Sequence, residues 1–192
     1  MIPRRTILAF LLMGLFACGD DTTTSSGPNA RFTPDTPAPG NSTMALLQST
    51  ASGAAVNVRI TATGIDDFFG AAFRITYDPD ALLFGGWDDN GSFLLDGVTA
   101  ADVLFQVDQT SIGGQVVIVA TRLDPVTVPA VDVGATATLL TLNFVARRPI
   151  AAGAADGRLD FGDPKQVCDG TVVPSGCNGI TVTWSGGGLS TN

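Results

Sequence analysis

The chain has 192 residues and a formal net charge of −8, with 18 acidic residues against 10 basic ones. It contains no histidine, and no basic cluster is larger than a pair such as Arg147-Arg148. The charge pattern excludes nucleic acid as a partner, because a phosphate backbone needs a patch of several cations. The lack of histidine excludes Ser-His-Asp and Cys-His catalysis and histidine-ligated zinc.

Residues 1–17 have the pattern of a bacterial lipoprotein signal peptide. Arg4 and Arg5 precede an apolar run that ends at Phe16, and small Ala17 stands directly before Cys18. The run is too short to span a bilayer. The pattern predicts export, cleavage after Ala17 and lipid attachment to the Cys18 thiol. We therefore expect a membrane-anchored lipoprotein of the cell envelope, periplasmic or on the cell surface; the alternatives are a plain secretory signal and a buried N-terminal helix.

Residues 18–42 are rich in proline, threonine and serine, and Phe32 is their only large apolar side chain. Such a segment cannot bury a core, so it is expected to be a disordered linker that spaces a domain from the membrane. The alternative is that part of it packs as an edge strand.

From Thr43 onward, hydrophobic residues alternate with polar ones and turn residues recur about every ten positions. Strands are predicted at residues 43–48, 56–60, 73–77, 81–87, 103–109, 115–123, 136–146, 158–161 and 179–184. No helical period follows the signal, and all acidic residues are aspartate, which favours turns over helices. The pattern predicts an all-β fold, a β-sandwich of about nine strands over residues 43–185, with a flexible glycine-rich tail at 186–192.

Two cysteines remain once Cys18 is lipidated. Cys168 and Cys177 flank turn residues at Asp169-Gly170 and 174–176, which allow a short loop to close. In an oxidising compartment they are expected to form a structural disulfide. A metal site would require more ligands than these two thiols, so none is predicted.

Two aspartate pairs, Asp66-Asp67 and Asp88-Asp89, are the candidates for a two-carboxylate glycosidase site. Neighbours on a strand point to opposite faces, and neighbours in turns are usually solvated. We therefore expect turn and capping roles, and a protein that is not an enzyme and uses no cofactor. A calcium loop at 86–97 is a weaker alternative, because glycine occupies its first and last ligand positions; Asn90-Gly91 is better explained as a tight turn.

A sugar site would need exposed aromatic rings for stacking. The candidates are Trp87, Trp184, Phe68 and Phe69. Consecutive phenylalanines on an extended strand point opposite ways, which leaves one of them free to face solvent. The favoured interpretation is that these rings fill the core and the ends of the sandwich.

The segment from Phe69 to Phe84 resembles the cohesin family, in which a strand ends in Tyr-Asp-Pro, here Tyr77-Asp78-Pro79, before Leu and Phe positions. Residues 116–123 and the glycine-led strand 134–144 are similar in order, so the resemblance covers about residues 43–184. The corner also has a structural explanation. Pro79 fixes φ for the turn, Asp78 accepts backbone N–H groups, and Tyr77 plugs the sandwich edge.

The resemblance implies a nine-stranded jelly-roll that binds without catalysis. Cohesins engage dockerin modules of polysaccharide-degrading enzymes and resemble a class of cellulose-binding module. We therefore expect a noncatalytic surface module that recognises a dockerin-type protein or a polysaccharide; the alternative is a structural or adhesive envelope lipoprotein without a small ligand. The resemblance carries over no contact residues, but Arg74, Thr76 and Arg122 are expected to be outward polar positions of a binding face.

Overall fold

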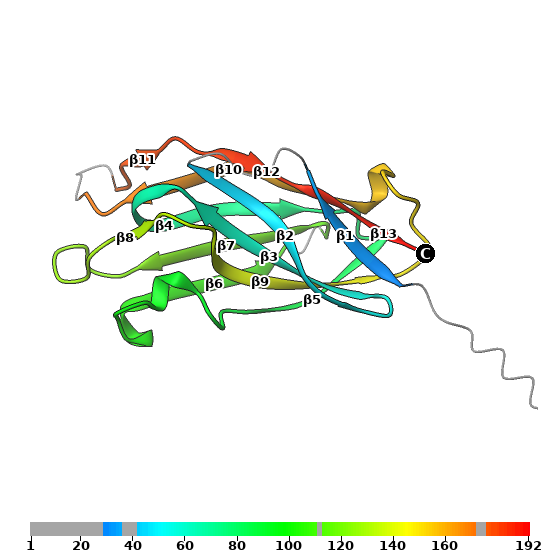
Figure 1. Cartoon of the computed structure of the whole chain (residues 1–192), viewed down its shortest axis with the longest axis horizontal. Coiled ribbons are helices and arrows are strands. Elements are labelled where there is room, and N and C mark those ends of the chain that lie inside the picture. Colours follow the sequence, from blue (N-terminus) through cyan, green and yellow to red (C-terminus); the bar gives the residue numbers. More distant parts are fainter. Residues whose placement is uncertain (1–28, 36–41, 111–112, 172–175) are drawn as a thin grey trace, which may run out of the picture.

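The structure is a computed structural model that describes residues 29–35, 42–110, 113–171 and 176–192 (Figure 1). The predicted signal peptide, Cys18 and most of the predicted linker lie outside the described residues. Within the described ranges, no helix is long and apolar enough to cross a membrane.

Two β-sheets pack face to face as a sandwich (Figure 1). The larger sheet has the order β1 (Ala30–Pro34), β13 (Gly187–Thr191), β10 (Arg158–Asp169), β4 (Ile65–Thr76), β7 (Gln115–Arg122) and β6 (Val103–Gln109), with β11 (Gly179–Ile180) beside β10 and β8 (Val131–Val133) beside β4. The smaller sheet has the order β12 (Thr183–Ser185), β2 (Thr43–Ser52), β3 (Ala55–Thr63), β9 (Ala137–Ala146) and β5 (Leu82–Asp88). Three short 3-10 helices are η1 (Phe93–Leu95), η2 (Ala100–Asp102) and η3 (Ala155–Gly157).

The predicted all-β sandwich is confirmed, and eight of the nine predicted strands correspond to β2, β3, β4, β5, β6, β7, β9 and β10. The ninth, predicted at 179–184, is instead two short strands in different sheets, β11 beside β10 and β12 beside β2. The short strand β8 and the terminal strands β1 and β13 add to the predicted set. β12 pairs with β2 in parallel, whereas the neighbouring pair β2 and β3 is antiparallel.

The core lies between the sheets, and several strands bury every second side chain. In β7, Val116, Ile118 and Ala120 are fully buried while the residues between them are half-buried. Aromatic rings join the two layers: Tyr77 of the large sheet meets Phe144 of the small one edge to face, with ring centroids 5.4 Å apart. This period of two is the pattern that identified the strands in the sequence.

The Tyr77 corner has the predicted structure. Tyr77 is 7% exposed, and its hydroxyl accepts a hydrogen bond from the Gln109 side-chain amide at 2.7 Å. The Asp78 carboxylate accepts the backbone N–H of Asp80 at 2.8 Å, and the Asp78 carbonyl accepts that of Leu82 at 2.9 Å. The corner therefore closes one edge of the sandwich and starts β5.

The two terminal segments differ from the sequence prediction. Residues 30–34, expected in a disordered linker, and 187–191, expected in a flexible tail, pair along their whole length as β1 and β13. Phe32 and Leu189 face each other in this pairing and are 2% and 1% exposed. The Phe32 ring enters the core, and the missing side chain of Gly187 leaves room for it, since a Cβ there would collide with the ring. The edge-strand alternative is therefore correct for residues 30–34.

An ion pair holds β1 at its end. The Arg158 guanidinium donates to both carboxylate oxygens of Asp35 at 2.7 Å and also to Asp160. The hydrogen bonds from Arg158 lower the pKa of Asp35. The contact joins the residue after β1 to the start of β10.

Candidate functional site

The large sheet presents one face to solvent along β10, β4, β7 and β6. We call this the open face, and its outward side chains are Asp160, Gly162, Gln166 and Cys168 on β10, Ala72, Arg74 and Thr76 on β4, Gln115, Val117, Val119 and Thr121 on β7, and Leu104, Gln106 and Asp108 on β6. None of these residues is buried, whereas their neighbours along the strands point into the core. A partner could therefore reach four adjacent strands at once.

The open face is shallow because its central residues are small. One cross-strand row consists of Gln166, Ala72, Val119 and Gln106, and the next contains Gly162, Arg74, Val117 and Asp108. A Cβ on Gly162 would approach the Thr76 methyl to 2.8 Å. Apolar side chains surrounded by amides and opposite charges have the composition of a protein–protein interface.

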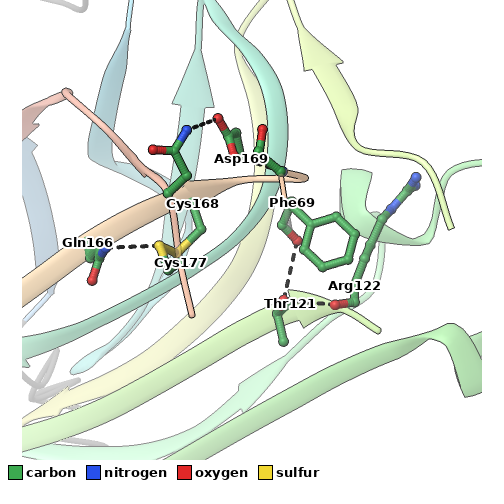
Figure 2. The surroundings of a disulfide bond; sticks show 9 residues. Phe69, Thr121, Arg122, Gln166, Cys168, Asp169 and Cys177 are labelled. Carbon is green, nitrogen blue, oxygen red and sulfur yellow. Dashed lines mark hydrogen bonds between the residues drawn. A yellow bond between two sulfur atoms is a disulfide. The ribbon is translucent and has the colours of Figure 1, made fainter. Parts of the chain in front are cut away.

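A disulfide borders the open face at one end (Figure 2). Cys168 and Cys177 are bonded, with Cα atoms 5.4 Å apart, as predicted from their spacing. The Cys177 Sγ accepts a hydrogen bond from the Gln166 amide at 2.9 Å. Gln166 and Cys168 both belong to the open face, so the disulfide limits that face on the β10 side.

The turn after Cys168 is held by Asp169. Its carboxylate accepts the Thr171 backbone N–H at 2.8 Å and the Asn178 side-chain amide at 2.5 Å. The backbone N–H of Thr171 is the main cause of the lowered pKa of Asp169. Gly170, in this turn, lies next to the Phe69 ring.

Arg122 is not an outward residue, contrary to the expectation from sequence. It is 3% exposed, on the inward side of β7. Its guanidinium donates to the backbone carbonyls of Leu94 at 3.0 Å, Asp96 at 2.5 Å and Pro129 at 2.6 Å. Burial lowers the pKa of the guanidinium. Arg122 therefore ties two loops to the sandwich, and of the three expected positions only Arg74 and Thr76 belong to the open face.

The two aspartate pairs differ in position. Asp66 and Asp67 belong to β4, at the irregularity of its pairing with β8, whereas Asp88 ends β5 and begins a turn. The turn role expected from the sequence therefore holds for Asp88-Asp89 and is wrong for Asp66-Asp67. The Asp67 backbone N–H donates to the Asp132 carboxylate at 3.0 Å. The Asp88 carboxylate accepts the backbone N–H of Asn90 at 2.6 Å and its side-chain amide at 2.9 Å, which forms the turn after β5. Within the described ranges, no group of three or more acidic or thiol side chains is placed to hold a metal ion.

The four candidate aromatic rings have different surroundings. Phe68 is fully buried against Phe93, and Phe69 on the opposite side of the strand is 9% exposed. Trp184 packs between Phe161 and Phe73. Phe68 and Trp184 fill the sandwich, as the favoured interpretation held. Phe69 is nearly buried outside the core, next to Gly170, and Trp87 is 39% exposed.

Trp87 lines a groove of about 490 Å³ on the outer face of the small sheet, which the sequence did not reveal. The groove is lined by Ser49, Thr50, Asn57, Gly85, Gly86, Trp87, Asp88, Asn90, Thr141 and Asn143. Asn57 and Asn143 stand at outward positions of predicted strands, so their exposure could be anticipated. Asn57 and Asn143 are register partners on neighbouring strands, and the alternation of residues does not reveal which strands are neighbours.

No protein-family model and no curated protein matches this chain. Solved structures do match it. A type II cohesin domain from the cellulosome of Acetivibrio cellulolyticus has a TM-score of 0.58 at 13% identity, over 79% of this chain and 95% of that one. A type II cohesin from Bacteroides cellulosolvens has a TM-score of 0.55 at 16% identity, over 79% and 98%.

The sixth cohesin of scaffoldin B from Acetivibrio cellulolyticus, solved in complex with a dockerin, has a TM-score of 0.52 at 21% identity, over 85% of this chain and 96% of that one. Identities this low establish the fold alone. The sheet order, the Tyr77 corner and these matches agree, and the protein has the cohesin-like β-sandwich fold.

Proposed function

We propose that this protein is a noncatalytic binding module, held at the cell envelope by a lipid on Cys18, that binds a dockerin-type protein through its open face. The setting is the binding or breakdown of polysaccharide. The alternative is a structural or adhesive envelope lipoprotein without a small ligand.

The observation that carries the proposal is the open face itself. Four adjacent strands present a row of small and apolar side chains, Ala72 and Val119 among them, between Gln106 and Gln166. Leu104 is 41% exposed at the β6 edge of the same face. A shallow apolar centre with polar neighbours fits a folded protein partner better than a small molecule, which requires a concave site.

The comparisons support a protein partner. Besides the sixth cohesin of scaffoldin B, a cohesin from Clostridium thermocellum solved in a cohesin–dockerin complex shares the fold, with a TM-score of 0.52 at 13% identity over 70% of this chain and 81% of that one. The Asp88 carboxylate holds the turn after β5, and Asp67 lies at an irregularity of β4 where its backbone N–H bonds to Asp132; these structural roles support a noncatalytic function.

The binding test uses the chain from Gly19 to Asn192, which keeps every described residue. It is used to capture exported proteins of its own cells, and captured dockerin-type proteins are then titrated against purified variants by calorimetry. Arg74→Asp and Val119→Asp each place a carboxylate on the open face and should weaken binding at least about tenfold. Val126→Ala, at a position that is 82% exposed and is not one of the open-face residues, is the matched control.

Unchanged affinity in both carboxylate variants would refute docking on the open face. Failure to capture any dockerin-type protein would favour the structural or adhesive alternative. The melting temperatures of the variants must match that of the wild type, so that lost binding reports the face and not unfolding.

The anchor is tested separately. Cys18→Ser should abolish incorporation of labelled lipid and move the protein from the membrane to the soluble fraction. A variant that stays with the membrane, together with a wild type that is never cleaved, would contradict the lipoprotein proposal.

A further inference from the structure

We propose that the groove on the outer face of the small sheet binds a neutral carbohydrate chain. The site lies on the other sheet from the open face, and the proposal goes beyond protein docking and does not depend on it. Three features of the groove carry the proposal: a row of fixed amides, a floor of glycine, and an exposed indole.

The amide row crosses four strands. Thr50 of β2, Asn57 of β3, Asn143 of β9 and Gly86 of β5 are successive register partners. The Asn143 side-chain amide donates to the Asn57 carbonyl oxygen at 2.9 Å, and the Asn57 amide donates to the Thr50 hydroxyl at 2.8 Å. Each bond uses one N–H, so a second N–H on each amide and the Thr50 hydroxyl hydrogen have no protein partner among the described residues.

These groups are fixed donors and acceptors at a surface hollow. Sugar hydroxyls both donate and accept, so they can pair with an amide N–H, an amide oxygen and a hydroxyl in the same row. Because the amides are already ordered by their own hydrogen bonds, binding would cost little side-chain entropy.

The floor of the groove is open because β5 carries two glycines. A Cβ on Gly85 would collide with the Asn143 amide oxygen, so only glycine leaves the amide in its place. Gly86 has a φ of +132°, which L side chains rarely adopt. The β5–β9 register shifts between Phe84 and Gly86, and the β2–β3 register shifts at the other end of the row. Such bulges commonly redirect side chains next to binding sites.

The aromatic wall is Trp87. Trp87 is among the lining residues and is 39% exposed, and its ring lies 6.2 Å from that of Phe105 on β6. Its register partner Leu142 is a core residue, so the indole lies at the β5 edge of the groove, supported by Phe105 on its inner side. The exposed part of the ring at this edge is free to pack on the apolar C–H face of a sugar ring that extends past β5. Aromatic faces carry partial negative charge, which attracts such C–H groups.

Charge and size define the ligand class. Asp88 is the single charged side chain among the lining residues, and it already holds Asn90. A carboxylate and no lining cation disfavour uronic acids and phosphorylated sugars, and favour a neutral chain. The volume of about 490 Å³ lies within the range of about 300–1,000 Å³ that is usual for ligand sites.

The experiment titrates the chain from Gly19 to Asn192 with cellohexaose, xylohexaose, mannohexaose and hexagalacturonate. The chain has two tryptophans, so its ¹⁵N–¹H spectrum has two indole signals, which Trp87→Phe assigns. At least one neutral hexasaccharide should shift the Trp87 signal and leave that of Trp184 in place. No shift of the Trp87 signal with any neutral hexasaccharide at millimolar concentration would overturn the proposal, as would tighter binding of hexagalacturonate than of every neutral probe.

Variants then test the residues. Trp87→Ala should weaken binding of the active hexasaccharide at least about tenfold, and Thr50→Val, which keeps the side-chain shape and removes the hydroxyl, several-fold. Thr50 is exposed, so its replacement should not disturb folding. Val126→Ala is the control and should bind like the wild type. Wild-type affinity in both Trp87→Ala and Thr50→Val would overturn the assignment of the site.

Discussion

The buried Arg122 provides the sharpest test of the structure. Arg122→Met keeps an unbranched side chain of similar length and removes all three donors, which leaves the carbonyls of Leu94, Asp96 and Pro129 without them. Each hydrogen bond from a charged donor contributes about 1.5–3 kcal/mol. The sum overstates the loss, because the variant no longer has to desolvate a guanidinium. Removing one partner from a buried charged network costs about 3–5 kcal/mol, and we expect a loss in this range.

The assay is urea unfolding of the chain from Gly19 to Asn192, with calorimetry in parallel. For a domain of this size, such a loss lowers the melting temperature by roughly 6–20 °C. Arg122→Lys keeps the charge and cannot reach three carbonyls in a fork, so it should fall between Arg122→Met and the wild type. Arg74→Ala on the open face is the matched control and should stay within about 0.5 kcal/mol. A loss below about 1 kcal/mol for Arg122→Met would refute the loop-tying role.

Three further results are expected for the same chain. Replacing Cys168 and Cys177 together by alanine should lower the free energy of unfolding by about 2–3 kcal/mol and keep the β-sheet circular dichroism spectrum, since the disulfide closes a short loop; unchanged stability would contradict this. Phe32→Ala should cost about 3–5 kcal/mol in urea unfolding, because the ring is 2% exposed, whereas a disordered linker would lose nothing. Arg158 lowers the pKa of Asp35 in the folded state, so the pair stabilises the fold above the unfolded carboxyl pKa of about 4 and loses this effect as the pH falls through the lowered pKa. The Arg158 and Asp35 side chains are 37% and 40% exposed, so Asp35→Asn should cost at most about 1 kcal/mol at neutral pH. In unfolding curves measured over a pH series, it should cost nothing at the acid end.

Much of the sandwich was predictable because its signals are local. The alternation of Val116, Ile118 and Ala120 with more exposed residues marks a strand with one buried face. The disulfide closes a loop of only ten residues, and the turn-forming residues lie within that loop. The Tyr77 corner is equally local, since Asp78 bonds residues two and four positions away. Such features depend on backbone geometry within a few residues.

Arg122 shows where the pattern is ambiguous. It continues the inward series of β7, but a charged side chain is rarely buried, so the sequence favours a surface position. The carbonyls of Leu94 and Asp96, more than 25 positions earlier, and of Pro129, seven positions later, compensate its burial, and no pattern within β7 indicates them.

The terminal strands and the groove were hidden for a related reason. β1 and β13 lack alternation long enough to be recognised, and they are stable because Phe32 and Leu189 meet across 157 positions of chain and enter a common core. The amide row likewise joins residues of four strands, and its register depends on two bulges.

The sequence by itself determined the all-β class, the positions of eight strands, the Tyr77 corner and the pairing of Cys168 with Cys177, because alternation, turn chemistry and loop closure act over short stretches of chain. The tertiary structure decided which side chains share a face: Arg74 with Val119 on the open face, and Asn57 with Asn143 in the groove. Such groupings depend on strand order and register, which are set by the packing of one sheet on the other and not by any single strand.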